Sequence, residues 1–224
     1  MLPEGEASPP EEFREILKTR APAFDLALSE TTCEKLSRFL GELDVARRRT
    51  NLTGPLSTQE LVDHALESAL GERLVPARAE LIDIGSGAGF PAVPIAIVRP
   101  DVCVTPVEPR RKRLEFLKAV SRQVGLDNVF AHETSVTNLV RGAADVATAR
   151  AVGRIDEVLG DAPFLKPGGL FLAWTTRATA DGLARRLARH FSPDSQLAVP
   201  GSRHKVIAAF RKNVPRGTGN ENEE

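Results

Sequence analysis

The chain has 224 residues, and its 30 Lys and Arg residues balance its 30 Asp and Glu residues, so the formal net charge at pH 7 is zero. This balance removes any argument from bulk electrostatics, and a partner must be inferred from local residues. Hydrophobic residues make up 42% and charged residues 27% of the chain, a globular mixture that excludes collagen-like and wholly disordered proteins.

The cysteines and the N-terminus indicate the compartment. Cys33 and Cys103 lie in unrelated contexts without a CxxC motif or a Cys/His cluster, which argues against structural zinc and fits a reducing cytosol. Residues 1–13 are rich in Pro and Glu where a signal peptide would need basic and then apolar residues, and no charge-free apolar run reaches about 18 residues. We therefore expect a cytoplasmic protein that does not act at a membrane.

Both ends of the chain are polar. Residues 1–10 and residues 213–224 contain little that folding could bury, so we expect disordered tails there. Between the tails, the pattern predicts a helical N-terminal extension over residues 11–75 and a second domain over residues 76–212, in which strands and helices alternate.

Two capping boxes predict where helices of the extension begin. Thr31 followed by Glu34 predicts one start, and Ser57 followed by Glu60 predicts another. The apolar positions that these helices should bury are Leu36, Phe39, Leu40 and Leu43 in the first and Leu61, Ala65, Leu66 and Ala69 in the second.

From Leu81 onward, short apolar runs predict strands. These runs are 81–84, 102–105, 128–133, 144–149, 169–174 (after a turn at 166–169) and 205–210. Helices are predicted between them, from near Pro109 to Gly125, near Asp156 and over 178–191. Strands that alternate with helices form parallel βαβ units, so the fold class is α/β with a doubly wound, mostly parallel sheet. Pro106 predicts a strand end or a bulge, because proline cannot donate to a ladder.

The glycine-rich run after the first strand is the strongest functional feature. Gly85, Gly87 and Gly89 stand where the chain turns from a strand into a helix whose free N–H groups face a ligand. Packing geometry alone also accounts for such a turn. The GxGxG spacing differs from the GxGxxG of dinucleotide sites, Asp83 would repel a pyrophosphate, and Glu108 stands where a carboxylate can accept ribose hydroxyls. Together these residues favour S-adenosylmethionine over NAD.

At this point the sequence resembles a known family, the bacterial small-subunit ribosomal RNA guanine-N7 methyltransferases called RsmG or GidB. The motifs that carry the resemblance are NLT at 51–53, HALES at 64–68, DIGSGAGFPAVPIAIVRP at 83–100, KR at 112–113 with FL at 116–117, TARAV at 148–152, LKPGG at 165–169 and RH at 203–204. The glycine motif is common to all class I methyltransferases, whereas FPxxPxAIxRP is particular to this family.

The resemblance implies a seven-stranded, Rossmann-like class I methyltransferase sheet with a helical N-terminal extension. It implies methyl transfer from S-adenosylmethionine to N7 of a guanine in 16S ribosomal RNA, presented as free RNA or in the small ribosomal subunit, and we expect a monomer. The cofactor-binding residues that it implies are Gly85, Gly87, Phe90, Glu108, Val136, Thr137 and Arg150, and the substrate-binding residues are Asn51 and Arg113.

This chemistry fits what the sequence lacks. Guanine N7 has an available lone pair and no proton to lose, so its attack on a sulfonium methyl needs no general base. In-line positioning, which supplies roughly 7–11 kcal/mol in favourable cases, would carry the catalysis. We therefore assign no catalytic acid or base, and the four histidines show no metal-ligand spacing, so we expect no metal.

Two departures from the family pattern leave other functions open. Thr137 replaces a usual glutamate, and Trp174-Thr175 stand where the family commonly has a lysine-glycine pair. A methyltransferase with another substrate, or a non-catalytic RNA-binding factor in ribosome assembly, is compatible with these changes. Trp174 itself could stack on the target guanine or pack in the core. His64 could contact substrate or be a structural residue.

Basic runs offer possible phosphate contacts. The runs are Arg47–Arg49 and Arg110–Arg113, and further basic residues are Arg203, Lys205, Arg211 and Lys212. Each run alone is also compatible with a solvated helix face. Their number favours one functional patch.

Overall fold

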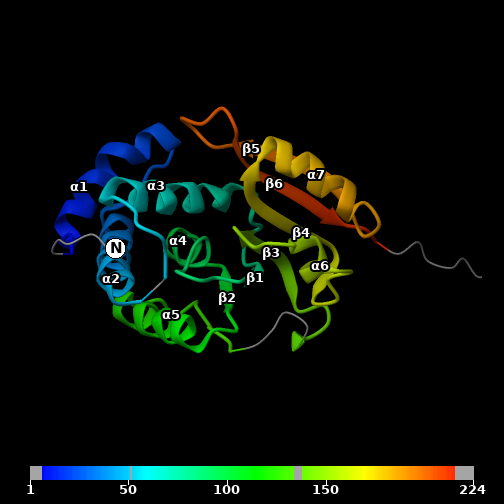
Figure 1. Cartoon of the computed structure of the whole chain (residues 1–224), viewed down its shortest axis with the longest axis horizontal. Helices are drawn as coiled ribbons and strands as arrows, with labels where there is room; N and C mark the ends of the chain where they lie inside the picture. Colours follow the sequence, from blue (N-terminus) through cyan, green and yellow to red (C-terminus); the bar gives the residue numbers. More distant parts are fainter. Residues whose placement is uncertain (1–6, 51, 134–137, 215–224) are drawn as a thin grey trace, which may run out of the picture.

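The computed structural model describes residues 7–50, 52–133 and 138–214, which form one mixed sheet flanked by helices (Figure 1). The strands are β1 (Glu80–Ile84), β2 (Cys103–Val107), β3 (Ala144–Arg150), β4 (Leu165–Thr176), β5 (Phe191–Ala198) and β6 (Lys205–Lys212). Their order is β2-β1-β3-β4-β6-β5, with β2, β1, β3 and β4 parallel and β6 antiparallel to both of its neighbours. The predicted α/β class with a mostly parallel sheet is confirmed.

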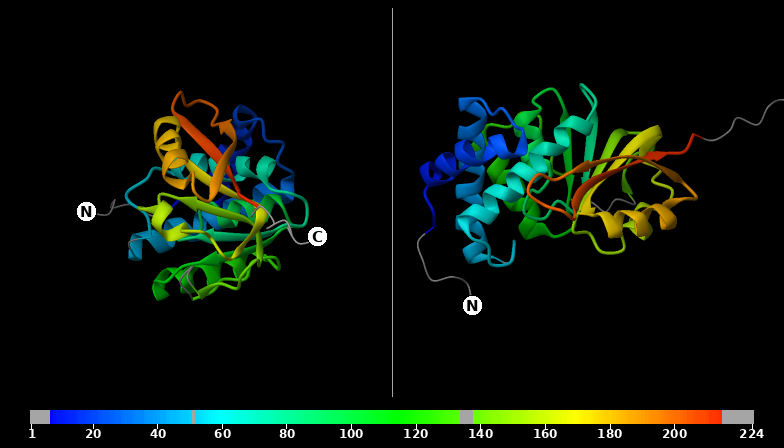
Figure 2. Two further views of the ribbon diagram at one scale, coloured as in Figure 1. Left: turned by 90° about the vertical axis from the view of Figure 1, so that its right-hand side faces the viewer. Right: turned by 90° about the horizontal axis from the view of Figure 1, so that it is seen from above.

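Helices cover both faces of this sheet (Figure 2). The helices are α1 (Pro10–Arg20), α2 (Glu30–Arg49), α3 (Thr58–Ala69), α4 (Ala92–Val98), α5 (Arg111–Val124), α6 (Ile155–Leu159) and α7 (Arg177–Leu187), with 3-10 turns η1 (Ala21–Phe24) and η2 (Leu70–Leu74). In the part of the chain that the structure describes, no helix combines the length and the apolar character needed to cross a membrane.

Two hydrophobic cores lie on the two faces. The first core lies between one face of the sheet and the helices α1, α2, α3, α4 and α5. All eight apolar positions predicted for the N-terminal helices are buried in it. The second joins the other face to α6 and α7. The first core runs from Phe13 to Ala209 without a break near residue 75, so the N-terminal helices and the sheet share their buried surface.

The number of strands differs from the seven that the family resemblance implies, since the described residues form a six-stranded sheet. The predicted strand 128–133 makes only two isolated bridges to β2, through Val129 and His132. Pro106 gives a physical reason. The amides of Val104 and Glu108 donate to this segment, and the position between them is a proline without an N–H.

β2 itself continues through Pro106, which pairs in register with Asp83, so the expected strand end or bulge was wrong. β2 lies at one edge of the sheet, and the proline nitrogen faces away from β1, so no ladder bond between β2 and β1 is lost. The expected turn at 166–169 lies instead inside β4, as an irregularity where the pairing with β3 shifts register.

The capping predictions had different outcomes. Ser57 and Glu60 form a capping box at α3, in which the Ser57 hydroxyl accepts from the Glu60 amide and the Glu60 carboxylate accepts from the Ser57 amide. The box at Thr31 was wrong, because α2 begins two residues earlier with Ser29 as its cap. Gly125 ends α5 with φ of +69°, as predicted.

Candidate functional site

The glycine turn connects β1 to α4. Gly85, Gly87 and Gly89 have φ of +71°, +54° and +94°, in the left-handed region that disfavours side chains. A Cβ on Gly85 would lie 3.2 Å from a methyl of Val152, and one on Gly89 would lie 2.9 Å from a methyl of Val93. Gly89 is therefore needed for packing of the core, while Gly85 lets the turn lie close to Val152 in the loop after β3.

Glu108 ties this turn to the end of β2. Its carboxylate accepts hydrogen bonds from the backbone amides of Gly87, at 3.0 Å, and Arg110, at 2.9 Å. The Arg113 guanidinium lies 3.9 Å from the same carboxylate. The residue is only 2% exposed, so its charge is held by amides and a guanidinium rather than by bulk solvent. The structure thus brings Gly87, Glu108 and Arg113 together.

Asp83 is a second buried carboxylate beside the turn. One of its oxygens accepts from the Thr148 hydroxyl at 2.7 Å, while the other is buried without a hydrogen-bond partner. Burial, with a contribution from the nearby Glu108 charge, raises the pKa of Asp83 to about 6. Two buried carboxylates around a glycine turn disfavour an anionic pyrophosphate and suit a ligand that carries positive charge and hydroxyl donors.

Arg150, at the end of β3, is directed toward α3. Its guanidinium donates to the carbonyl of His64, to the hydroxyl of Ser68 and to the carboxylate of Glu67, and it lies 5.8 Å from the ring centre of Phe90. Desolvation by burial lowers the pKa of Arg150 despite the Glu67 charge. These contacts join the N-terminal helices to the carboxyl end of the sheet.

Glu67 is a residue of this site that the sequence reasoning missed. It is buried and accepts from both Arg150 and Lys205, the latter at 2.5 Å. Its backbone carbonyl accepts from the indole of Trp174 at 2.7 Å. The only signal in the sequence is its place in HALES, since its partners lie 83 to 138 residues away.

Trp174 packs in the molecular interior. It is buried, and its ring fills the space above Gly71 of η2. Of the two interpretations that the sequence left open, the structure supports core packing.

His64 and Phe90 meet edge to face, with ring centres 5.8 Å apart. Phe90 also contacts Phe39 of α2, so the residue after the glycine turn is packed against both α2 and α3. Burial and the nearby Arg150 charge lower the pKa of His64 to about 4, which keeps its imidazole neutral at pH 7.

Three of the implied site residues, Asn51, Val136 and Thr137, lie outside the described residues.

Several basic residues that the sequence offered as phosphate contacts are used in contacts within the protein. Arg47 and Arg48 bind the buried carboxylate of Asp44, so they stabilise α2 itself. Near the C-terminus, Arg211 pairs with Asp194, and Lys212 donates to two backbone carbonyls. These pairings favour structural roles over phosphate contacts for these residues.

A family description matches most of the chain: residues 32–205 fit GidB, rRNA small subunit methyltransferase G. The chain belongs to this family. It is 35% identical over 206 residues to the ribosomal RNA small subunit methyltransferase G of Halorhodospira halophila, with 90% of this chain and 98% of that protein covered. The protein of the same name from Sorangium cellulosum is 38% identical, with 74% of this chain and 71% of that protein covered.

Solved structures share the fold of this GidB family chain. A SAM-dependent methyltransferase from Aquifex aeolicus superposes with a TM-score of 0.55 at 14% identity, covering 66% of this chain and 89% of that chain. TYW2 of M. jannaschii, solved with AdoMet, gives 0.54 at 15% identity, covering 68% and 77%. These likenesses confirm the class I methyltransferase fold.

Membership of the GidB family implies S-adenosylmethionine as methyl donor. The residues around the turn fit this group on their own chemistry. Gly85 and Gly87 present backbone without side chains in the turn, and the carboxylates of Asp83 and Glu108 flank it. A sulfonium with an ammonium and ribose hydroxyls matches this set of acceptors.

Proposed function

We propose that the chain transfers the methyl group of S-adenosylmethionine to N7 of a guanine in 16S ribosomal RNA. The observation that carries the proposal is the glycine turn clamped to the buried carboxylate of Glu108, in a chain of the GidB family. The same turn in a dinucleotide enzyme would face a pyrophosphate, which the carboxylates of Asp83 and Glu108 disfavour.

In this proposal, the turn and the end of β2 bind the donor. Gly85 and Gly87 let it approach the backbone, and the lone pairs that Glu108 does not use for amides accept the ribose hydroxyls. Phe90 and Arg150 border the proposed donor site on the side of α3. The resemblance to the family assigns Val136 and Thr137 to the adenine.

The proposed chemistry depends on positioning. When bound, S-adenosylmethionine supplies an electrophilic methyl group on a sulfonium. The lone pair of guanine N7 would bond to this methyl carbon as its bond to sulfur breaks, leaving a neutral thioether and a positively charged N7-methylguanine, so no residue needs to take a proton. The neutral His64 and the Arg150–Glu67 ion pair hold the wall of the site in place. Rate acceleration then comes from alignment and exclusion of water.

We further propose that Asn51 and Arg113 contact the RNA and that the protein acts as a cytoplasmic monomer on free 16S RNA or on the small ribosomal subunit. Arg113 supports this role, because it lies against Gly87 and also reaches the surface at the start of α5.

Transfer of a labelled methyl group tests the function. Purified protein, labelled S-adenosylmethionine and unmodified 16S RNA or small subunits should yield one N7-methylguanosine, mapped by mass spectrometry. Calorimetry should show S-adenosylmethionine binding to the protein alone. Binding of NAD instead, or methylation only of small molecules or proteins, would contradict the proposal. RNA binding without any transfer would support a non-catalytic assembly factor.

A further inference from the structure

A basic groove lies between the end of α2 and the start of α5. It is a cavity of 730 Å³ lined, among the described residues, by Arg49, Thr50, Leu52, Arg110, Arg111, Lys112 and Arg113. Five of these seven residues are cationic and none is acidic. The two segments are about 60 positions apart in the sequence, so the fold itself brings the two sets of charges together. We call this cavity the basic groove.

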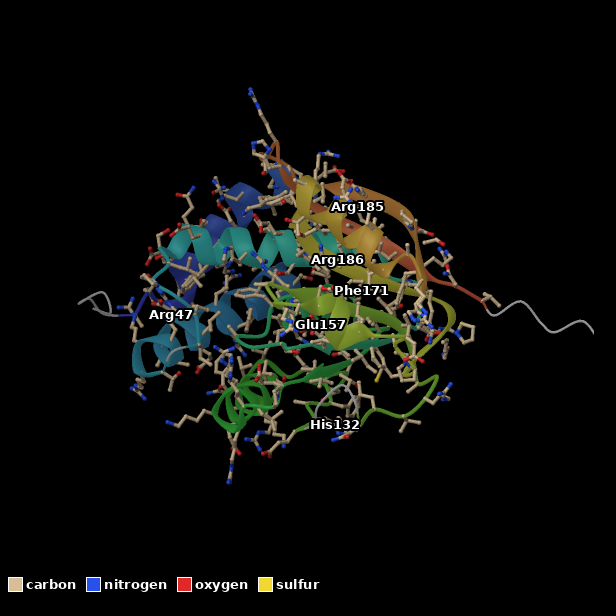
Figure 3. All side chains as sticks on the ribbon, turned by 45° about the vertical axis from the view of Figure 1, so that its right-hand side comes forward. Arg47, His132, Glu157, Phe171, Arg185 and Arg186 are labelled. Atoms are coloured by element: carbon tan, nitrogen blue, oxygen red, sulfur yellow. The ribbon has the colours of Figure 1, made fainter. Side chains whose placement is uncertain are left out.

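Most cations of the basic groove are not used for internal ion pairs. Within residues 7–50, 52–133 and 138–214, Arg49, Arg110 and Lys112 make no salt bridge, and all three are exposed. Arg111 has one solvated contact with Glu115 at 3.5 Å. By contrast, the neighbouring Arg47 turns inward to Asp44. Figure 3 shows Arg47 at the α2 end of the molecule, far from Arg185 and Arg186 of α7.

Fold stability does not account for these cations. The N-cap and the first turn of α5 hold four successive basic residues and no acidic one, at the helix end where the dipole disfavours positive charge. Mutual repulsion among the side chains adds to this cost. A polyanion in the groove would relieve both, since its phosphates would neutralise the cations at the positive end of the helix.

The groove leads directly to the proposed methyl-donor site. Arg113 lines the groove, and its guanidinium lies 3.9 Å from Glu108 and close to Gly87 of the glycine turn. A strand whose phosphates lie along Arg49, Arg110 and Lys112 would therefore pass beside the turn. This adjacency favours RNA over an anionic membrane surface, which is flat and would not enter a groove.

We propose that the basic groove binds the phosphate backbone of the RNA strand next to the methylated nucleotide. This proposal rests on the proposed function for the identity of the RNA. The contacts are to phosphates, so they position the strand and do not read its bases. Arg49 and Lys112 hold the strand from opposite walls of the groove.

The test compares two double variants. Arg49→Ala/Lys112→Ala removes one charge from each wall, and in the described part of the chain the hydrogen bonds and ion pairs of Glu108 come from Gly87, Arg110 and Arg113 and not from these two side chains. Lys118→Ala/Arg185→Ala is the matched control, because it also removes two exposed charges, from a later turn of α5 and from α7. Binding of a short fluorescein-labelled 16S RNA oligonucleotide is measured by anisotropy over a series of salt concentrations.

The groove variant should bind RNA roughly tenfold more weakly in moderate salt, with the slope of log K against log salt reduced by about 1.4. The control should keep the wild-type affinity and slope. Both variants should keep the wild-type affinity for S-adenosylmethionine in calorimetry. If the wild-type protein itself did not bind S-adenosylmethionine, that result would count against the proposed function and not against the groove.

Three results would overturn the proposal. They are wild-type RNA affinity and salt slope in the groove variant, an equal loss of RNA affinity in the control, and binding of the wild type to phosphatidylserine vesicles with none to RNA. The first would make the groove irrelevant to RNA, the second would reduce its effect to bulk charge, and the third would assign it to membranes.

Discussion

Gly85 combines two constraints that substitution can separate. Its φ of +71° disfavours any side chain, and a Cβ would lie 3.2 Å from a methyl of Val152, in the turn where the donor is proposed to bind. Gly125 has almost the same φ, +69°, with open space around its missing Cβ. Alanine at either position should cost about 1–2 kcal/mol of stability from backbone strain.

Only Gly85→Ala should also weaken S-adenosylmethionine binding, by at least tenfold, because only there does the methyl group meet the ligand space. Thermal denaturation compares the two stabilities, and calorimetry compares the donor affinities. If Gly125→Ala weakened donor binding equally, the effect would be strain of the whole fold, and the pocket would have to be placed elsewhere.

Asp83 should make the protein less stable as pH rises. The unfolded chain ionises this carboxyl near its ordinary pKa of 3.8, whereas the folded protein keeps it protonated up to about pH 6. Between these values the unfolded state binds fewer protons, so this group lowers the free energy of unfolding as pH increases. At about 1.4 kcal/mol per pKa unit, the loss amounts to roughly 3 kcal/mol above pH 6.

Asp83→Asn keeps the acceptor for Thr148 and cannot ionise. The stability of this variant relative to the wild type should therefore rise between pH 4 and pH 6 and then level off, as urea titrations at a series of pH values would show. A difference that is constant with pH would mean that the buried Asp83 is already compensated by a partner. The same variant should bind S-adenosylmethionine more weakly, if the carboxylate attracts the cationic donor.

Single residues of the site were predictable to different degrees. Gly87 and Glu108 follow from local spacing after two strands, and the Gly87 amide does donate to the Glu108 carboxylate. The partners of Arg150 could not be predicted from the sequence. Glu67 of α3 reaches Arg150 at the end of β3 only in the folded chain, and no local pattern indicates the pair. Long-range ion pairs leave no periodic trace in a sequence.

At the scale of elements, the strands with continuous apolar runs were predicted well and the edges were not. β5 was missed because it is polar along most of its length, with Pro193 near its start, and only Phe191 is fully buried. It is the outermost strand at its side of the sheet, where such residues are tolerated. At the other edge, Pro106 limits segment 128–133 to isolated bridges.

The junction of η2 with β4 allows a test at this scale. A Cβ on Gly71 would overlap the six-membered ring of Trp174, which is fixed by its hydrogen bond to Glu67. Gly71→Ala should therefore destabilise the protein by about 1–3 kcal/mol through overpacking. Gly54→Ala, with nothing near the added methyl group, should have little effect.

Chemical denaturation of the two variants measures the difference, and Trp174→Phe tests its origin. Phenylalanine removes the overlapping ring atoms, so the loss from Gly71→Ala should be smaller in the Trp174→Phe background than in the wild type. Purely additive losses would mean that the methyl group is accommodated by movement of η2 instead.

The whole molecule is neutral, yet its charges are not evenly distributed. Cations gather in the basic groove, while the carboxylate of Glu108 is buried next to one of them, Arg113. Net charge therefore predicted nothing about RNA, since the relevant quantity is the local field at one face. The first hydrophobic core, in contrast to this local cluster of charge, extends across the molecule from the N-terminal helices to β6.

That shared core predicts a single cooperative unfolding transition. Trp174 is the only tryptophan and the chain has no tyrosine, so fluorescence reports on the contact between η2 and β4, whereas far-UV circular dichroism reports on all helices. If residues 11–75 detached from the sheet first, the fluorescence of Trp174 would change at lower urea than the ellipticity. We expect the two curves to coincide, because detachment would expose Phe39, Leu66 and their neighbours to water at about 25 cal/mol per Å² of apolar surface. Separate midpoints would instead establish the N-terminal helices as an independently folding unit.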